Sequence, residues 1–149
     1  MLSQKVINKI LEDGFYFDDE FDFEKNEVVL TKKSREWFNN NLGIKNVNSS
    51  FVDFYSFVIG PTGKGEPLYD LEQIIKDYEN PFWKEQYPNI TDNYLQISSI
   101  EGQGSYFYDK ETDAVYDVDW SQMDDFMAGK LEPMFNSFYD FLEWYYSED

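Results

Sequence analysis

The segment from Tyr94 to Trp120 constrains the fold most, because its pattern specifies strands. Between Ala114 and Trp120, apolar residues alternate with Asp117 and Asp119. A period of two with one apolar face is typical of a strand that is packed on one side and exposed to water on the other. We therefore expect a sheet with one wet face here.

Two further apolar runs, at 94–100 and 105–108, precede this strand, and a polar turn at 109–113 joins the last two runs. This arrangement predicts an antiparallel hairpin. Helical periodicity surrounds it, and we expect helices at Leu2–Asp13, Thr31–Leu42, Asp70–Tyr78, after Ser50 and after Pro133. The chain should form an α+β fold, an antiparallel sheet with helices packed against it, in a single domain over 1–149.

The expected helix ends carry specific signals. Thr31 and Asp70 are preferred N-cap residues. Ser50 and Asp53 have the spacing of a related Ser-x-x-acid cap, and Pro133 belongs to a residue type favoured at the first helical position. We expect Thr31, Ser50 and Asp70 to cap helices and Pro133 to open the last one.

Composition excludes several kinds of chemistry. The chain has no Cys and no His, which removes thiolate nucleophiles, disulfides, Ser-His catalysis and the usual zinc ligands. No run of apolar residues resembles a signal peptide or a membrane span, so we expect a cytoplasmic protein. The predicted sites include no catalytic residue, no cofactor and no metal.

Charge indicates the kind of partner. Thirty acidic residues against twelve basic ones give a net charge of −18. Nucleic acids and anionic membranes are themselves polyanions, so neither is expected to bind directly. A basic protein is the expected partner; the alternative is that the charge serves only solubility. The oligomeric state, monomer or dimer, stays open.

Acidic residues gather near the predicted hairpin, where only Lys110 and Lys130 oppose them. Trp120 lies beside them and is interpreted as a core residue, with an interface anchor as the alternative. A dense patch of one sign accelerates association with a basic partner. The candidate partner-binding residues are Asp109, Glu111, Asp113, Asp117, Asp119, Asp124 and Asp125.

Other candidate sites fail on spacing. The loop 60–65 lacks the first glycine and the hydroxyl residue of a phosphate loop, and 109–120 lacks the glycine and final glutamate of a calcium loop. Asp117 and Asp119 form a possible carboxylate pair, but such pairs are common in so acidic a chain. The segment 15–30 alternates Phe with acids and is interpreted as an edge strand or an acidic docking surface.

Several segments follow one another along the chain in a characteristic order. They are Glu36–Gly43, the aromatic helix Phe51–Gly60, Leu68–Leu71, the Gly-rich strand Ile100–Tyr108, its partner Ala114–Trp120 and the closing helix Phe138–Leu142. This order resembles the SUKH superfamily, which includes bacterial immunity proteins and fungal regulators of glucan synthesis. The resemblance covers about 31–146. The superfamily's Leu-Pro before the second helix is replaced by Asn46-Val47-Asn48, and 15–30 has no counterpart.

The resemblance implies a non-catalytic immunity protein that binds and neutralises a cognate toxin, often a nuclease. The acidic surface would then imitate the toxin's polyanionic substrate. The alternative is a regulatory scaffold in cell-wall or glucan synthesis that binds protein partners. A small carboxylate enzyme is a third, less favoured interpretation.

Overall fold

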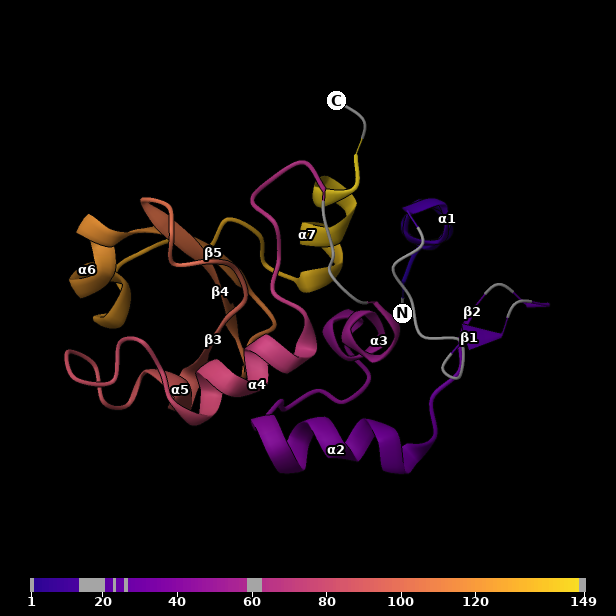
Figure 1. Ribbon diagram of the computed structural model, residues 1–149, viewed down its shortest axis with the longest axis horizontal. Coiled ribbons are helices and arrows are strands. Elements are labelled where there is room, and N and C mark those ends of the chain that lie inside the picture. The colour runs from indigo at the N-terminus through magenta and orange to yellow at the C-terminus, as the bar shows by residue number, and fades with distance from the viewer. Residues whose placement is uncertain (1, 14–20, 23, 26, 59–62, 148–149) are drawn as a thin grey trace.

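The α+β fold contains an antiparallel sheet with strand order β3-β4-β5 (Figure 1). The computed structural model describes residues 2–13, 21–22, 24–25, 27–58 and 63–147. The strands are β3 (Tyr94–Gln96), β4 (Gly104–Asp109) and β5 (Val115–Asp119). The predicted hairpin and fold class are confirmed, although the first strand ends at Gln96 instead of residue 100.

Both faces of the sheet are covered over most of its length, so the expectation of one wet face is confirmed only at Asp117 and Asp119. In β4, only Gly104 is not buried. Val115 shares a face with Asp117, yet Val115 is buried because Phe135 forms an antiparallel bridge with it. Exposure is confined to Asp117 and Asp119 at the far end of β5.

The main core lies on one face of the sheet and is rich in aromatic rings. The Phe51 and Tyr108 rings stack with centroids 4.0 Å apart, and Phe138 meets each edge-on at 5.1 and 5.6 Å. Such pairs add to the free energy gained from burial alone. The helices that supply this core are α1 (Gln4–Asp13), α2 (Lys32–Leu42), α3 (Ser50–Phe57), α4 (Leu71–Glu79) and α7 (Phe138–Tyr145).

A second, smaller cluster covers the opposite face. Phe107 and Val118 of the sheet pack there against Phe126. Trp120 is partly buried: it packs against this cluster and donates its indole N–H to the Gly102 carbonyl at 2.8 Å. It lies at the edge of this core, so a contact with a partner remains the alternative. The helical elements here are α5 (Ile90–Asn93), the 3₁₀ turn η2 (Trp120–Gln122) and α6 (Met123–Met127), and Figure 1 shows α6 at one end of the molecule.

Two predicted helix starts are correct and two are displaced. Thr31 and Asp70 cap α2 and α4. Ser49, not Ser50, caps α3, and the buried Asp53 pairs with Arg35 at 2.9 Å.

The last helix begins at Phe138 instead of Pro133. The Ser137 hydroxyl accepts a hydrogen bond from the Asp140 N–H at 3.1 Å and so caps α7. The chain cannot turn into a helix earlier, because Phe135 pairs in extended form with Val115.

The acidic segment 15–30 contributes a separate two-stranded hairpin, β1 (Phe21–Asp22) and β2 (Glu27–Val28). Residues 15–20, 23 and 26 lie outside the described part of the chain, so the choice between an edge strand and a docking surface stays open. Among the helices that are described, none has the length and apolar character that crossing a membrane requires.

Gly104 tests the packing of the hairpin. A Cβ atom at Gly104 would lie 2.2 Å from the Val118 carbonyl oxygen, so the Gly104→Ala variant must displace β5. We expect a loss of about 1–3 kcal/mol in the free energy of unfolding, measured by urea denaturation. The control is Gly102→Ala, whose added atom would meet only the Gly104 carbonyl at 3.9 Å. Equal stability of the two variants would contradict this close approach.

Candidate binding surface

The structure divides the seven predicted acidic residues among three places. Their positions determine which of them can meet a partner. Asp109, Glu111 and Asp113 belong to the hairpin turn, Asp117 and Asp119 to the exposed end of β5, and Asp124 and Asp125 to the first turn of α6.

Two of the turn carboxylates hold the fold together. Asp109 is only 9% exposed, and its Oδ1 accepts the backbone N–H groups of Glu111 and Thr112 at 2.9 and 3.1 Å. Asp113 Oδ1 accepts the Tyr108 hydroxyl at 2.6 Å, while its Oδ2 accepts the Phe138 N–H at 3.2 Å. Both side chains therefore satisfy donors of the protein itself, and Glu111 is the exposed acid of the turn.

Burial raises the pKa of the Asp113 carboxyl, and its two hydrogen bonds oppose that rise. Burial likewise raises the pKa of the Tyr108 hydroxyl. Tyr108 is therefore neutral, and its hydroxyl donates a hydrogen bond to the Asp113 carboxylate. The Asp113 carboxylate thus connects the hairpin to the start of α7 through these two hydrogen bonds.

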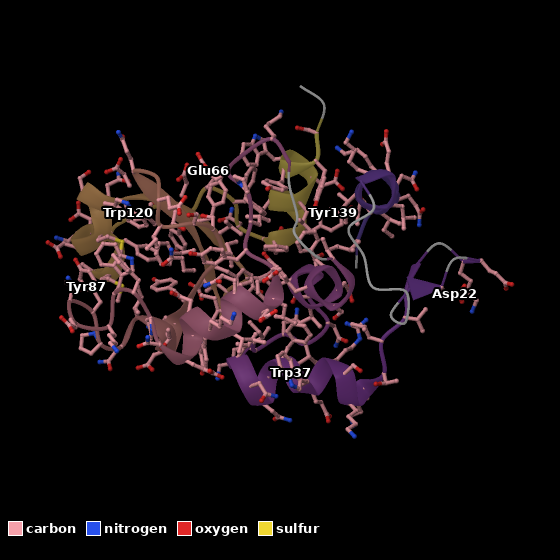
Figure 2. All side chains as sticks on the ribbon, in the orientation of Figure 1. Asp22, Trp37, Glu66, Tyr87, Trp120 and Tyr139 are labelled. Carbon is pink, nitrogen blue, oxygen red and sulfur yellow. The ribbon has the colours of Figure 1, made fainter. Side chains whose placement is uncertain are left out.

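Asp117 and Asp119 line a groove of about 670 Å³. Its other walls come from the loop at 64–66, the glycine-rich turn at 102–104 and α7. Glu66 and Trp144 also face this groove. In the view of Figure 2, Glu66 lies between Trp120 and Tyr139. The groove thus brings together residues that are far apart in the sequence.

The loop wall is fastened by hydrogen bonds to the core. Lys64 donates its N–H to the Tyr145 carbonyl at 2.7 Å, and the Tyr145 hydroxyl donates to the Glu66 carbonyl at 2.9 Å. The Glu66 N–H donates to the Tyr106 hydroxyl at 3.3 Å. Because Tyr106 and Tyr145 are buried, the backbone of this wall is held in place.

The carboxylates in the groove repel one another. Burial raises the pKa of Asp117, and the negative charges of Asp119 and Glu66 raise it further. At Asp119, hydrogen bonds from the Ser121 hydroxyl and N–H lower the pKa. Within the described part of the chain, no ion pair joins Glu66, Asp117 or Asp119 to a basic side chain. The groove therefore sets three carboxylates against one lysine, Lys64, and none of the three forms an ion pair with it in the described structure.

The third group of acids lies on α6. Asp124 and Asp125 are exposed, and Asp124 accepts a hydrogen bond from the Tyr87 hydroxyl. The short η2 turn separates them from Asp119. Because α6 packs on the face of the sheet opposite the groove, Asp124 and Asp125 form a second acidic area, next to the groove along the chain.

Sequence reasoning missed Glu66 and Trp144. Neither stands in an acidic run near the hairpin, and no local pattern singles them out. Their place in the groove depends on contacts between the loop, α7 and the sheet. Among the residues that the structure describes, no three His, Cys, Asp or Glu side chains gather in a way that could hold a metal ion.

A second hollow of about 480 Å³ lies beside the C-terminal half of α4. Asp77 lines it together with Lys76 and Lys84. Burial raises the pKa of Asp77 to about 6, and a hydrogen bond from the Phe82 N–H opposes the rise. Charge at Asp77 thus costs stability near neutral pH.

Comparison with known proteins gives no match to a protein-family model, a curated protein or a solved structure. The resemblance to the SUKH superfamily remains a prediction from the sequence.

Variants of Asp113 and Glu111 distinguish an acid that stabilises the fold from an acid that is exposed for binding. Asp113→Ala leaves the Tyr108 hydroxyl and the Phe138 N–H without their acceptor, which should lower the free energy of unfolding by about 2–3 kcal/mol. Glu111→Ala removes an exposed side chain and should change it by less than about 0.5 kcal/mol. Urea denaturation of both variants measures the difference. Equal stabilities of the two variants would show that Asp113 does not stabilise the fold and belongs with the surface acids.

The raised pKa of Asp77 predicts that the free energy of unfolding depends on pH. In the unfolded chain its pKa is near 3.8, so between that pH and about 6 the unfolded state loses the proton that the folded state keeps. Stability therefore falls through this range, and the cost is complete above it. Asp77→Asn removes the charge and should stabilise the protein at pH 7.5 by on the order of 1–2 kcal/mol, after allowance for solvent screening.

This gain should shrink at pH about 4.5, because the wild-type carboxyl is then protonated in the folded state and partly so in the unfolded state. Urea denaturation at both pH values measures it. Glu79→Gln, an exposed change on the same helix, is the control. A gain that does not vary with pH would contradict burial of the Asp77 charge.

Proposed function

We propose that this chain is a non-catalytic immunity protein that binds and neutralises a basic toxin through its acidic surface. The observation that carries the proposal is the groove, which three carboxylates line and where no described basic side chain pairs with them. The net charge of −18 and the exposed acids of α6 support it. The sequence resemblance to SUKH immunity proteins points in the same direction.

The physical mechanism is occlusion aided by electrostatic attraction. A toxin that acts on nucleic acid presents cationic side chains to a polyanionic substrate. An acidic protein surface offers those side chains competing anions, and the field of the surface accelerates the encounter. The bound protein then covers the toxin's site. We place this action in the cytoplasm, in keeping with the expectation from the sequence.

The first experiment is a pull-down from the native cells with this chain as bait, washed at about 50 mM and about 500 mM salt, where screening differs strongly. We expect a basic protein that is retained at low salt and released at high salt. Expression of the captured protein should arrest growth, and co-expression of this chain should restore it. Recovery of cell-envelope enzymes without growth arrest would instead support the regulatory scaffold.

Charge reversal then tests the surface. A variant with Glu66→Lys, Asp124→Lys and Asp125→Lys should bind the captured protein at least about tenfold more weakly. The control reverses three exposed acids with the same change in net charge, Glu12→Lys, Glu36→Lys and Glu79→Lys on α1, α2 and α4. Equal loss in both variants would show that total charge, and not this surface, governs binding.

A further inference from the structure

The groove combines features that suit one chemical group in particular. Its walls hold the carboxylates of Glu66, Asp117 and Asp119 and the aromatic side chains of Tyr106 and Trp144. We propose that it binds an arginine side chain carried on an extended segment of the partner. This inference rests on the proposed function, because it assigns the contact by which that partner would be recognised.

The backbone that borders the groove is closely packed. A Cβ atom at Gly65 would lie 2.1 Å from the Tyr106 hydroxyl, and one at Gly104 would lie 2.2 Å from the Val118 carbonyl. These close approaches, together with the hydrogen bonds that join Lys64 and Glu66 to Tyr145 and Tyr106, hold the loop and the glycine-rich turn in place. A preformed site loses less conformational entropy on binding than one that must be ordered.

The charges in the groove call for a cation. Asp117 is near enough to Asp119 and Glu66 for their charges to raise its pKa, in addition to the effect of burial. A cation bound beside Asp117 would relieve this repulsion. Lys64, which also lines the groove, forms no ion pair with the three carboxylates in the described structure.

The indole ring of Trp144 favours arginine over lysine, whereas the Tyr106 ring is buried against Phe141. A guanidinium group is planar, stacks on aromatic rings and donates paired hydrogen bonds to a carboxylate. Trp144 is half-buried against Phe141 and Phe135, with ring centroids 6.0 and 5.9 Å away, so its ring is held in position. A lysine ammonium would gain the charge contact but not the stacking on a planar group.

The edge of β5 accounts for the extended conformation. Val115 exchanges backbone hydrogen bonds with Phe135 on the side away from β4, while Trp120 donates its N–H inward to Gln103. By the alternation of an antiparallel ladder, the N–H and C=O groups of Asp117 also point away from β4. No described residue bonds to them there. An extended segment lying in the groove can pair with these groups.

The test uses three peptides of the form acetyl-Gly-Xaa-Gly-Xaa-Gly-amide, in which Xaa is Arg, Lys or Glu. Amide chemical shifts of the isotope-labelled full chain are followed during titration. We expect the arginine peptide to shift residues 64–66, 102–104 and 117, with a dissociation constant at least about threefold lower than that of the lysine peptide. The glutamate peptide should leave these signals unchanged.

Matched variants locate the contact. Asp117→Asn keeps the side-chain volume and should weaken binding of the arginine peptide about fivefold or more, whereas Asp125→Asn on α6 should not. Unchanged dispersion of the amide spectrum shows that each variant is folded. Shifts confined to α6, equal binding of the arginine and lysine peptides, or equal effects of the two variants would overturn the proposal.

The same variants separate this inference from the proposed function. If the captured basic toxin still binds Asp117→Asn normally but fails to bind a variant with reversed charges on α6, the groove is not the contact and the immunity function stands. If the arginine peptide binds the groove but no growth-arresting partner is found, the groove site stands and the immunity function falls.

Discussion

The carboxylate of Asp113 connects the central strand β4 to the last helix, α7. Its Oδ1 accepts the hydroxyl of Tyr108 in β4, and its Oδ2 accepts the N–H of Phe138, the first residue of α7. The Tyr108 ring also stacks on Phe51 of α3, and Phe138 packs edge-on against that pair. One short turn thus fixes the start of the last helix relative to the sheet and to α3.

The groove depends on this junction. Once the start of α7 is fixed, its last turn places Trp144 in the groove wall and Tyr145 under the loop at 64–66. Tyr145 then bonds to both Lys64 and Glu66, which sets the opposite wall. The position of Glu66 is therefore a consequence of core packing. We expect changes at the junction to disturb binding indirectly, through the geometry of α7.

Structural features that depend on neighbouring residues could be predicted from the sequence, whereas features that depend on tertiary pairing could not. The hairpin and the caps at Thr31 and Asp70 depend on nearby residues and are confirmed. Pro133 looked like a helix start, but the pairing of Phe135 with Val115 keeps that stretch extended. Asp113 looked like one surface acid among many, because a carboxylate that accepts two internal hydrogen bonds has no distinct sequence pattern.

Placing Asp117 near other acids costs folding free energy, and the solubility of the chain does not require that arrangement. Separated, fully exposed carboxylates would keep the chain soluble without the burial and repulsion that raise the Asp117 pKa. Such a group destabilises the folded state wherever it is charged. A cation bound in the groove would remove part of that cost, so folding and recognition are coupled at this position. This coupling favours a binding role for the groove over a role in solubility alone.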